Sequence, residues 1–147
     1  MLSIAHTLIS LPFAFWLEHP FAIFLAAVAA HFLADTLLHW NIYPDPKRPY
    51  PVLAVAADVL GGVAVAWLLL GDAFLTLPVL VAIAGGNAPD VLHGLWELLP
   101  AKRRRQGPRW FNASFKWHDK LQVETTNVAA GLVSQVIAVG FALWLIS

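Results

Sequence analysis

The sequence predicts an all-α, polytopic membrane protein with about five transmembrane helices, and three observations point to this class. Of the 147 residues, 59% are hydrophobic and only 12% are charged, whereas an average soluble domain is about 45–50% apolar and about 25% charged. Five apolar stretches approach the roughly 20 residues that a helix needs to cross a bilayer. The basic residues gather in two of the connecting loops. We therefore expect a single transmembrane helical domain over residues 1–147.

The first expected span, at about 2–17, is short and contains Pro12. It lacks the basic start and the small-residue cleavage pattern of a signal peptide, so we expect a helix of the mature protein. Proline or glycine residues mark turns at Pro20, at Pro51 and at Gly71-Asp72. The remaining spans are expected at about 21–40, 51–71, 73–99 and 127–146.

The placement of lysine and arginine predicts the orientation of these spans. Lys47 and Arg48 follow the second span, and the other seven basic residues lie between Lys102 and Lys120, after the fourth. Because basic residues accumulate in cytoplasmic loops, we expect the amino terminus inside and the carboxyl terminus outside. The two turns on the opposite side contain no lysine or arginine, which agrees with this orientation.

Six ionisable residues inside the expected spans fall at a similar depth. Each costs about 2.5–3.5 kcal/mol at mid-membrane, so each requires an explanation. A rise of about 1.5 Å per residue places all six roughly 7–15 Å from the inner boundary. A single polar cavity that opens to the cytoplasm would collect residues in this way. The six are His6, His31, Asp35, Asp58, Asp90 and His93.

The second span carries a pattern that suits metal binding. His31, Asp35 and His39 are spaced i, i+4 and i+8, which places neighbours on one face of a helix. An imidazole and a carboxylate one turn apart are a common way for a helix to present two ligands to a zinc-like ion. An ion pair that only fixes helix packing is the structural alternative, and His39 could instead be an interfacial histidine.

The fourth span contains two glycines and a proline directly before Asp90 and His93. We expect the helix to break or kink there, because irregular backbone at membrane depth is tolerated where it lines a cavity. For Asp90 and His93, as for the second span, an interhelical ion pair that only fixes packing is the structural alternative. His6 could lie at the headgroups, and Asp58 is either a ligand completed by another span or an acid that orients an imidazole.

Residues 100–126 form the only extended polar stretch and mix basic with aromatic side chains. A helix that starts near Pro108 would place Phe111, Phe115, His118 and Leu121 on or near one face. We expect it to lie on the cytoplasmic membrane surface, where each basic residue attracts anionic lipid by about 1 kcal/mol. Simple topology marking is the alternative for the basic run. His118 and Asp119 could complete a metal site or transfer protons, and nucleic acid binding is not expected.

At Pro89-Asp90-x-x-His93 and His31-x-x-x-Asp35, with His6 in the opening helix, the chain resembles small bacterial inner-membrane proteins of the YdjM-like type. That family is classed as membrane-bound metal-dependent hydrolases. The chain departs from the family pattern in three ways. Leu92 replaces a second aspartate, and no HR-x-x-THS segment is present. The His-x-x-x-Asp motif also comes before the Pro-Asp motif instead of after it. The resemblance implies that the metal-site residues are His6, His31, Asp35, Asp90 and His93.

These observations together predict a membrane-embedded, metal-dependent hydrolase that acts on an ester or phosphoester, most naturally of a lipid, at the cytoplasmic leaflet. With no cysteine in the chain, one or two divalent ions, zinc for example, would be held by imidazole and carboxylate groups. Rival interpretations are a transport or proton-relay protein, a haem-binding electron carrier and a non-catalytic membrane subunit. The expected catalytic residues are Asp58, His118 and Asp119, and the expected headgroup-binding residues are Arg103, Arg104, Arg105 and Arg109.

Overall fold

A computed structural model describes residues 1–42 and 52–147, and over these ranges the regular elements are helices. The all-α prediction is therefore confirmed. The expected turn at Pro51 and the basic residues Lys47 and Arg48 lie outside the described residues. The helices are α1 (Ser3–Trp16), α2 (Pro20–Asp35), α3 (Val52–Leu70), the short 3-10 helix η1 (Gly71–Leu75), α4 (Leu77–Leu98), α5 (Ala101–Gln106), α6 (Arg109–Leu121) and α7 (Val128–Trp144).

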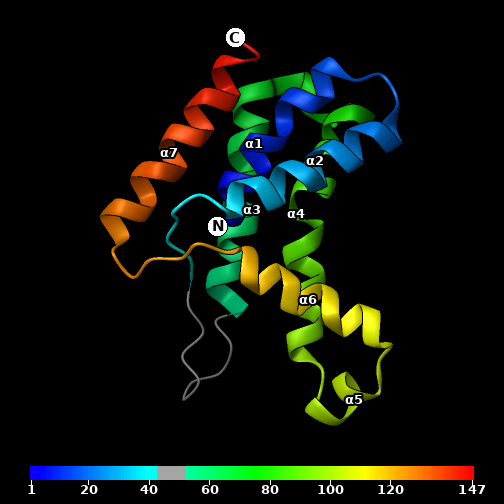
Figure 1. Ribbon diagram of the computed structural model, residues 1–147. Helices are drawn as coiled ribbons and strands as arrows, with labels where there is room; N and C mark the ends of the chain where they lie inside the picture. Colours follow the sequence, from blue (N-terminus) through cyan, green and yellow to red (C-terminus); the bar gives the residue numbers. More distant parts are fainter. Residues whose placement is uncertain (43–51) are drawn as a thin grey trace.

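Helix α1 is the centre of the arrangement, and it packs against α2, α3, α4 and α7 (Figure 1). Leu8 and Leu11 of α1 form the main apolar cluster with Ala66 of α3 and Val79 of α4. Because α1 is enclosed on several sides, its polar residues are buried as well, among them His6. The first helix of the chain therefore carries polar side chains into the interior.

The expected five-span topology is not supported, because most of the helices are too short. Within the described ranges, only the stretch Val52–Leu75 is long and apolar enough to cross a membrane. Helices α1, α2 and α7 have 14, 16 and 17 residues, which corresponds to about 21–26 Å at 1.5 Å per residue. The hydrocarbon core of a bilayer is roughly 30 Å thick. The orientation with the amino terminus inside and the carboxyl terminus outside rested on five spans and loses that support.

The expected break in the fourth apolar stretch is absent, since α4 runs without interruption from Leu77 to Leu98 with Pro89 inside it; a kink at this position stays a prediction. The two glycines serve close helix packing instead. A Cβ atom added to Gly85 would lie 2.7 Å from the carbonyl oxygen of Phe24 in α2, and one added to Gly86 would lie 2.9 Å from that of His6 in α1. Pro89 removes one backbone hydrogen bond from α4. Next to this position, α2 and α1 pack closely against α4 on two sides.

Helix α2 ends at Asp35 rather than near residue 40, so the helical i, i+8 relation of His39 to His31 is not realised. The chain beyond α2 pairs instead with the segment that follows α6. The Val123 amide donates to the Asp35 carbonyl at 2.9 Å, and the His39 amide donates to the Val123 carbonyl at 3.0 Å. This backbone pairing replaces further helical turns and fixes the end of α6 beside the end of α2.

The helix expected from Pro108 is present as α6, with Phe115 and His118 buried on its inner face. Phe115 stacks on Trp96 of α4, with ring centroids 5.0 Å apart. Trp110 and Trp117 lie on the outer side, with 73% and 55% of their surfaces exposed. The placement of α6 on a membrane surface stays a prediction.

Candidate metal centre

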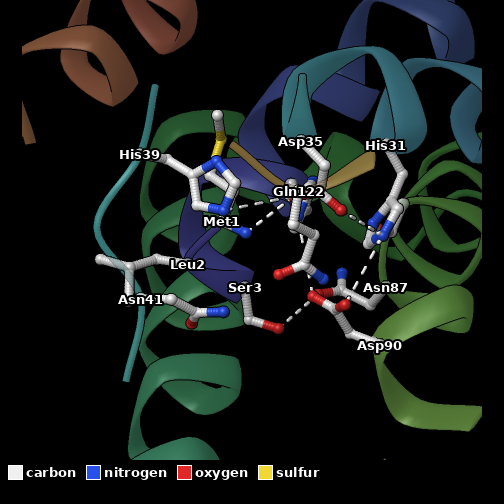
Figure 2. Close-up of polar contacts among 12 residues, drawn as sticks. Met1, Leu2, Ser3, His31, Asp35, His39, Asn41, Asn87, Asp90 and Gln122 are labelled. Carbon is white, nitrogen blue, oxygen red and sulfur yellow. Dashed lines mark hydrogen bonds and ion pairs between the residues drawn. The ribbon is translucent and has the colours of Figure 1, made fainter. Parts of the chain in front are cut away.

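Four side chains from three helices converge next to α1. His31 and Asp35 come from the last turns of α2, Asp90 from α4 and His118 from α6. Their ligand atoms all lie within 4.8 Å of one another, so this group, which we call the His/Asp centre, could hold a metal ion. Figure 2 shows His31 and Asp35 reaching from α2 toward Asp90.

The two imidazoles of the His/Asp centre share one carboxylate oxygen. Asp35 Oδ2 lies 3.2 Å from His31 Nε2 and 3.0 Å from His118 Nε2, and the two nitrogens are 3.2 Å apart. Asp90 Oδ1 lies 3.6 Å from each of the same two nitrogens. Of the two carboxylates, Asp35 is fully enclosed, whereas 28% of the Asp90 side chain is exposed.

The carbonyl of Gly86 fixes the tautomer of His31. His31 Nδ1 lies 2.8 Å from this oxygen, and because a carbonyl only accepts, Nδ1 must carry the proton. In the neutral ring, Nε2 then presents a lone pair toward the carboxylates and His118. A histidine whose second nitrogen donates to a backbone carbonyl is oriented in the way that metal-bound histidines usually are.

His6 of α1 adds a third imidazole, which lies over His31 with ring centroids 3.8 Å apart and planes inclined by 24°. Its Nε2 atom lies 3.2 Å from Asp35 Oδ1 and 3.6 Å from Asp90 Oδ2. The ring is almost completely buried, and within the described residues neither of its nitrogens has a hydrogen-bond partner. Such unsatisfied buried nitrogens are rare in folded proteins.

His39 approaches the same carboxylate from beyond the end of α2. Its Nδ1 donates to the Leu37 carbonyl at 2.8 Å, and its Nε2 lies 3.9 Å from Asp35 Oδ1. Burial lowers the pKa of the His39 imidazole, and the positive charge of the Met1 amino group adds to this effect. The amino group itself donates to Asp35 Oδ1 at 2.7 Å (Figure 2).

Polar contacts between α1 and α4 hold His6 and Asp90 in place. Asn87, one turn before Asp90, accepts a hydrogen bond from Ser3 Oγ at 2.8 Å and donates one to Thr7 Oγ1 at 2.9 Å. Because Ser3 and Thr7 flank His6 on α1, these bonds set how far α1 can slide along α4. The position of the His6 ring relative to the carboxylates is therefore fixed by neighbouring side chains.

His93, expected as a ligand, faces a different carboxylate. Its Nε2 lies 3.5 Å from Asp119 Oδ1 and 4.0 Å from Glu97 Oε1. Its ring stacks on Phe115 at 5.2 Å and lies 5.3 Å from the ring of His118. His93 and Asp119 thus form a pair immediately beside the His/Asp centre.

Asp58, expected as a catalytic residue, reaches from α3 to the start of α1. Its carboxylate accepts the backbone N–H groups of Ser3 at 2.6 Å and Ile4 at 3.2 Å. These are among the amides that the first turn of a helix leaves without a partner. In this position, Asp58 caps α1 across the helix interface.

A cleft of about 560 Å³ adjoins the His/Asp centre between α3, α4 and the end of α6. Asp58, Asp90, His93 and Asp119 all line it. Gln122 lines the cleft too, and its Nε2 lies 3.3 Å from His118 Nε2. Sequence reasoning missed Gln122; its i+4 spacing from His118 on α6 was the one available signal.

The expected headgroup-binding arginines have mixed surroundings. Arg104 pairs with Glu97 at 3.1 Å and lies over the Trp96 ring at 4.9 Å. Arg103 and Arg109 are exposed, and the side chain of Arg105 lies outside the described residues.

Comparison of the chain with protein-family models, with curated proteins and with solved structures gives no match. The resemblance to the YdjM-like hydrolases therefore stays an expectation from the sequence motifs.

Proposed function

We propose that the chain is a membrane-associated, metal-dependent hydrolase whose ion is held by the His/Asp centre. The supporting observation is the meeting of His31 Nε2 and His118 Nε2, 3.2 Å apart, between two carboxylates. The tautomer of His31 leaves a lone pair at Nε2, and carboxylate oxygens also carry lone pairs. A cation bound here would replace the proton between His118 Nε2 and Asp35 Oδ2, which lie 3.0 Å apart, and would be held by the lone pairs of the four groups.

The spacing of the donor atoms fits a small ion with four ligands. Tetrahedral zinc with bonds of about 2.0–2.1 Å separates its ligand atoms by roughly 3.3–3.4 Å. Five of the separations within the His/Asp centre are 3.0, 3.2, 3.2, 3.6 and 3.6 Å. The donor set, two imidazoles and two carboxylates without thiolate, also suits zinc or another divalent ion of the first transition series.

When bound, such an ion supplies Lewis-acid polarisation of an ester or phosphoester oxygen and a lowered pKa for water. Asp90 is the member of the centre that is partly exposed, and it lines the cleft. Substrate therefore approaches from the Asp90 side. The His93–Asp119 pair lines the same cleft, where its imidazole can accept or return a proton at the reacting group.

A lipid ester or phosphoester is the proposed substrate class, because the surface beside the cleft is strongly apolar. Only 11% of the apolar window in Val52–Leu75 is buried inside the protein, and on α3 the side chains of Leu53 and Leu68 are 87% and 74% exposed. The core helix of a soluble domain would be mostly enclosed. We propose α3 as a membrane span of a bacterial inner-membrane protein, with the basic helices α5 and α6 at the cytoplasmic leaflet.

The test combines metal analysis with turnover of the detergent-solubilised protein. Wild-type protein should carry stoichiometric divalent metal and cleave a phosphodiester or phospholipid substrate, and chelation should abolish cleavage. Asp35→Asn should lose both metal and activity. Asp72→Asn is the matched control, because this acid is exposed on η1. Folded wild-type protein that contains no metal, or that stays active when metal-free, would contradict the proposal.

A further inference from the structure

We infer that the two carboxylates bridge a second cation position, held by His6 and His39, so that the centre is dinuclear. This inference rests on the proposed function, because the second position shares Asp35 and Asp90 with the first. The four-residue group of the His/Asp centre accounts for one ion only.

The carboxylate oxygens divide between two sets of imidazoles. Asp35 Oδ2 and Asp90 Oδ1 face His31 and His118. The opposite oxygens, Asp35 Oδ1 and Asp90 Oδ2, face His6 Nε2 at 3.2 and 3.6 Å. Each carboxylate thus presents one oxygen to each side, which is the arrangement of a bridging ligand.

The stacked histidines direct their Nε2 atoms at the two oxygens of one carboxylate. The rings of His6 and His31 lie 3.8 Å apart and nearly parallel, and each directs Nε2 at a different oxygen of Asp35. Two ions bound to these nitrogens would share Asp35, one on each of its oxygens, and would therefore be close neighbours. Ions in two-metal hydrolytic sites are about 3.5–4 Å apart.

Unpartnered buried nitrogens point independently to a ligand at the second position. Both ring nitrogens of His6 and Nε2 of His39 lack a hydrogen-bond partner within the described part of the chain. Nδ1 of His39 donates to the Leu37 carbonyl, so the neutral ring presents a lone pair at Nε2 toward Asp35 Oδ1, 3.9 Å away. A cation at this position would give both rings a partner.

The amino group of Met1 is the rival occupant, since it donates to Asp35 Oδ1 at 2.7 Å. If the ammonium group alone neutralises this side of Asp35, the protein binds one ion. If a metal ion takes the position, the protein binds two, and His6 and His39 are required for the second ion only. Stoichiometry therefore separates the two occupants.

The experiment measures manganese binding and the electron paramagnetic resonance spectrum of the metal-depleted, reloaded protein. Wild-type protein should bind two equivalents and give an exchange-coupled spectrum. His6→Gln and His39→Gln should each bind one equivalent and give the six-line spectrum of an isolated ion. His19→Gln is the matched control, because this histidine is exposed at the start of α2, and circular dichroism checks that each variant is folded.

Wild-type protein that binds one equivalent, or His6→Gln and His39→Gln variants that both keep two, would overturn the second position. In the first case the proposed function survives with one ion at the His/Asp centre. Folded wild-type protein that binds neither manganese nor zinc would overturn both proposals. The two failures are therefore distinguishable.

Discussion

His31 and His118 lie 87 positions apart in the chain, yet their Nε2 atoms are 3.2 Å from each other. The approach depends on the pairing of the Val123 amide with the Asp35 carbonyl, which joins the ends of α6 and α2. His31 is then oriented by the Gly86 carbonyl of a third helix. A metal-binding arrangement at this point requires α2, α4 and α6 together.

His93 and His118 should respond differently to truncation. His118→Ala should lose the bound metal, because His118 Nε2 lies 3.0 Å from Asp35 Oδ2. His93→Ala should keep the metal but lower kcat, since His93 Nε2 faces Asp119 instead. Metal analysis together with the pH profile of kcat checks this. Equal metal loss in both variants would place His93 among the ligands.

Removing the carboxylate of Asp58 should lower stability without changing metal content. Asp58→Ala leaves the Ser3 and Ile4 amides without their acceptor, at a cost of about 1–3 kcal/mol. Asp58→Asn retains one acceptor oxygen and should lose less. Thermal unfolding and metal analysis are the measurements, and metal loss from a folded Asp58→Asn variant would speak against a capping role.

A methyl group at Gly86 should destabilise the protein. The added Cβ would lie 2.9 Å from the His6 carbonyl oxygen and from Ser10 Cβ, and overpacking of this kind costs about 1–3 kcal/mol. Gly61→Ala is the matched control, because nothing lies within 4 Å of the added atom and alanine favours helix over glycine by about 1 kcal/mol. Chemical unfolding should therefore give opposite signs for the two substitutions.

The outer face of α6 should make stability depend on lipid charge. Lys116 and Lys120 are exposed on the same helix as Trp110 and Trp117. Protein in anionic bilayers should unfold at a higher temperature than protein in zwitterionic bilayers. In the double variant Lys116→Gln/Lys120→Gln, the free energy by which anionic lipid stabilises the protein should fall by about 2 kcal/mol. Added salt should shrink the effect in the wild type. An unchanged difference in the double variant would exclude α6 as the contact.

The helices and much of the candidate centre could be predicted from the sequence, because continuous apolar stretches and the His31-x-x-x-Asp35 spacing are local signals. Long-range pairing could not be predicted in this way. Nothing in the local sequence marks Asp35 as the end of α2, since the partner that ends it is Val123. The glycines of α4 were misread for a similar reason: their role depends on the backbones of α1 and α2.

Helix length accounts for the largest error. Composition predicted five lipid-facing stretches, and five of the observed helices fall in them, but three have 14, 16 and 17 residues. Apolar content indicates how much surface is buried or faces lipid. The length of a helix depends instead on the points at which side chains or other segments take over its backbone hydrogen bonds. His19 and Asn127, which cap α2 and α7 through their side chains, are such points.

The candidate ligands are distributed from His6 near the start of the chain to His118 in its last third. During synthesis, His6, His31 and Asp35 emerge first and Asp90 follows, but His118 is absent until translation has passed most of the chain. A nascent chain therefore lacks one of the four side chains that could hold an ion until α6 has been made. The His/Asp centre is complete only after α6 has docked against α2 and α4.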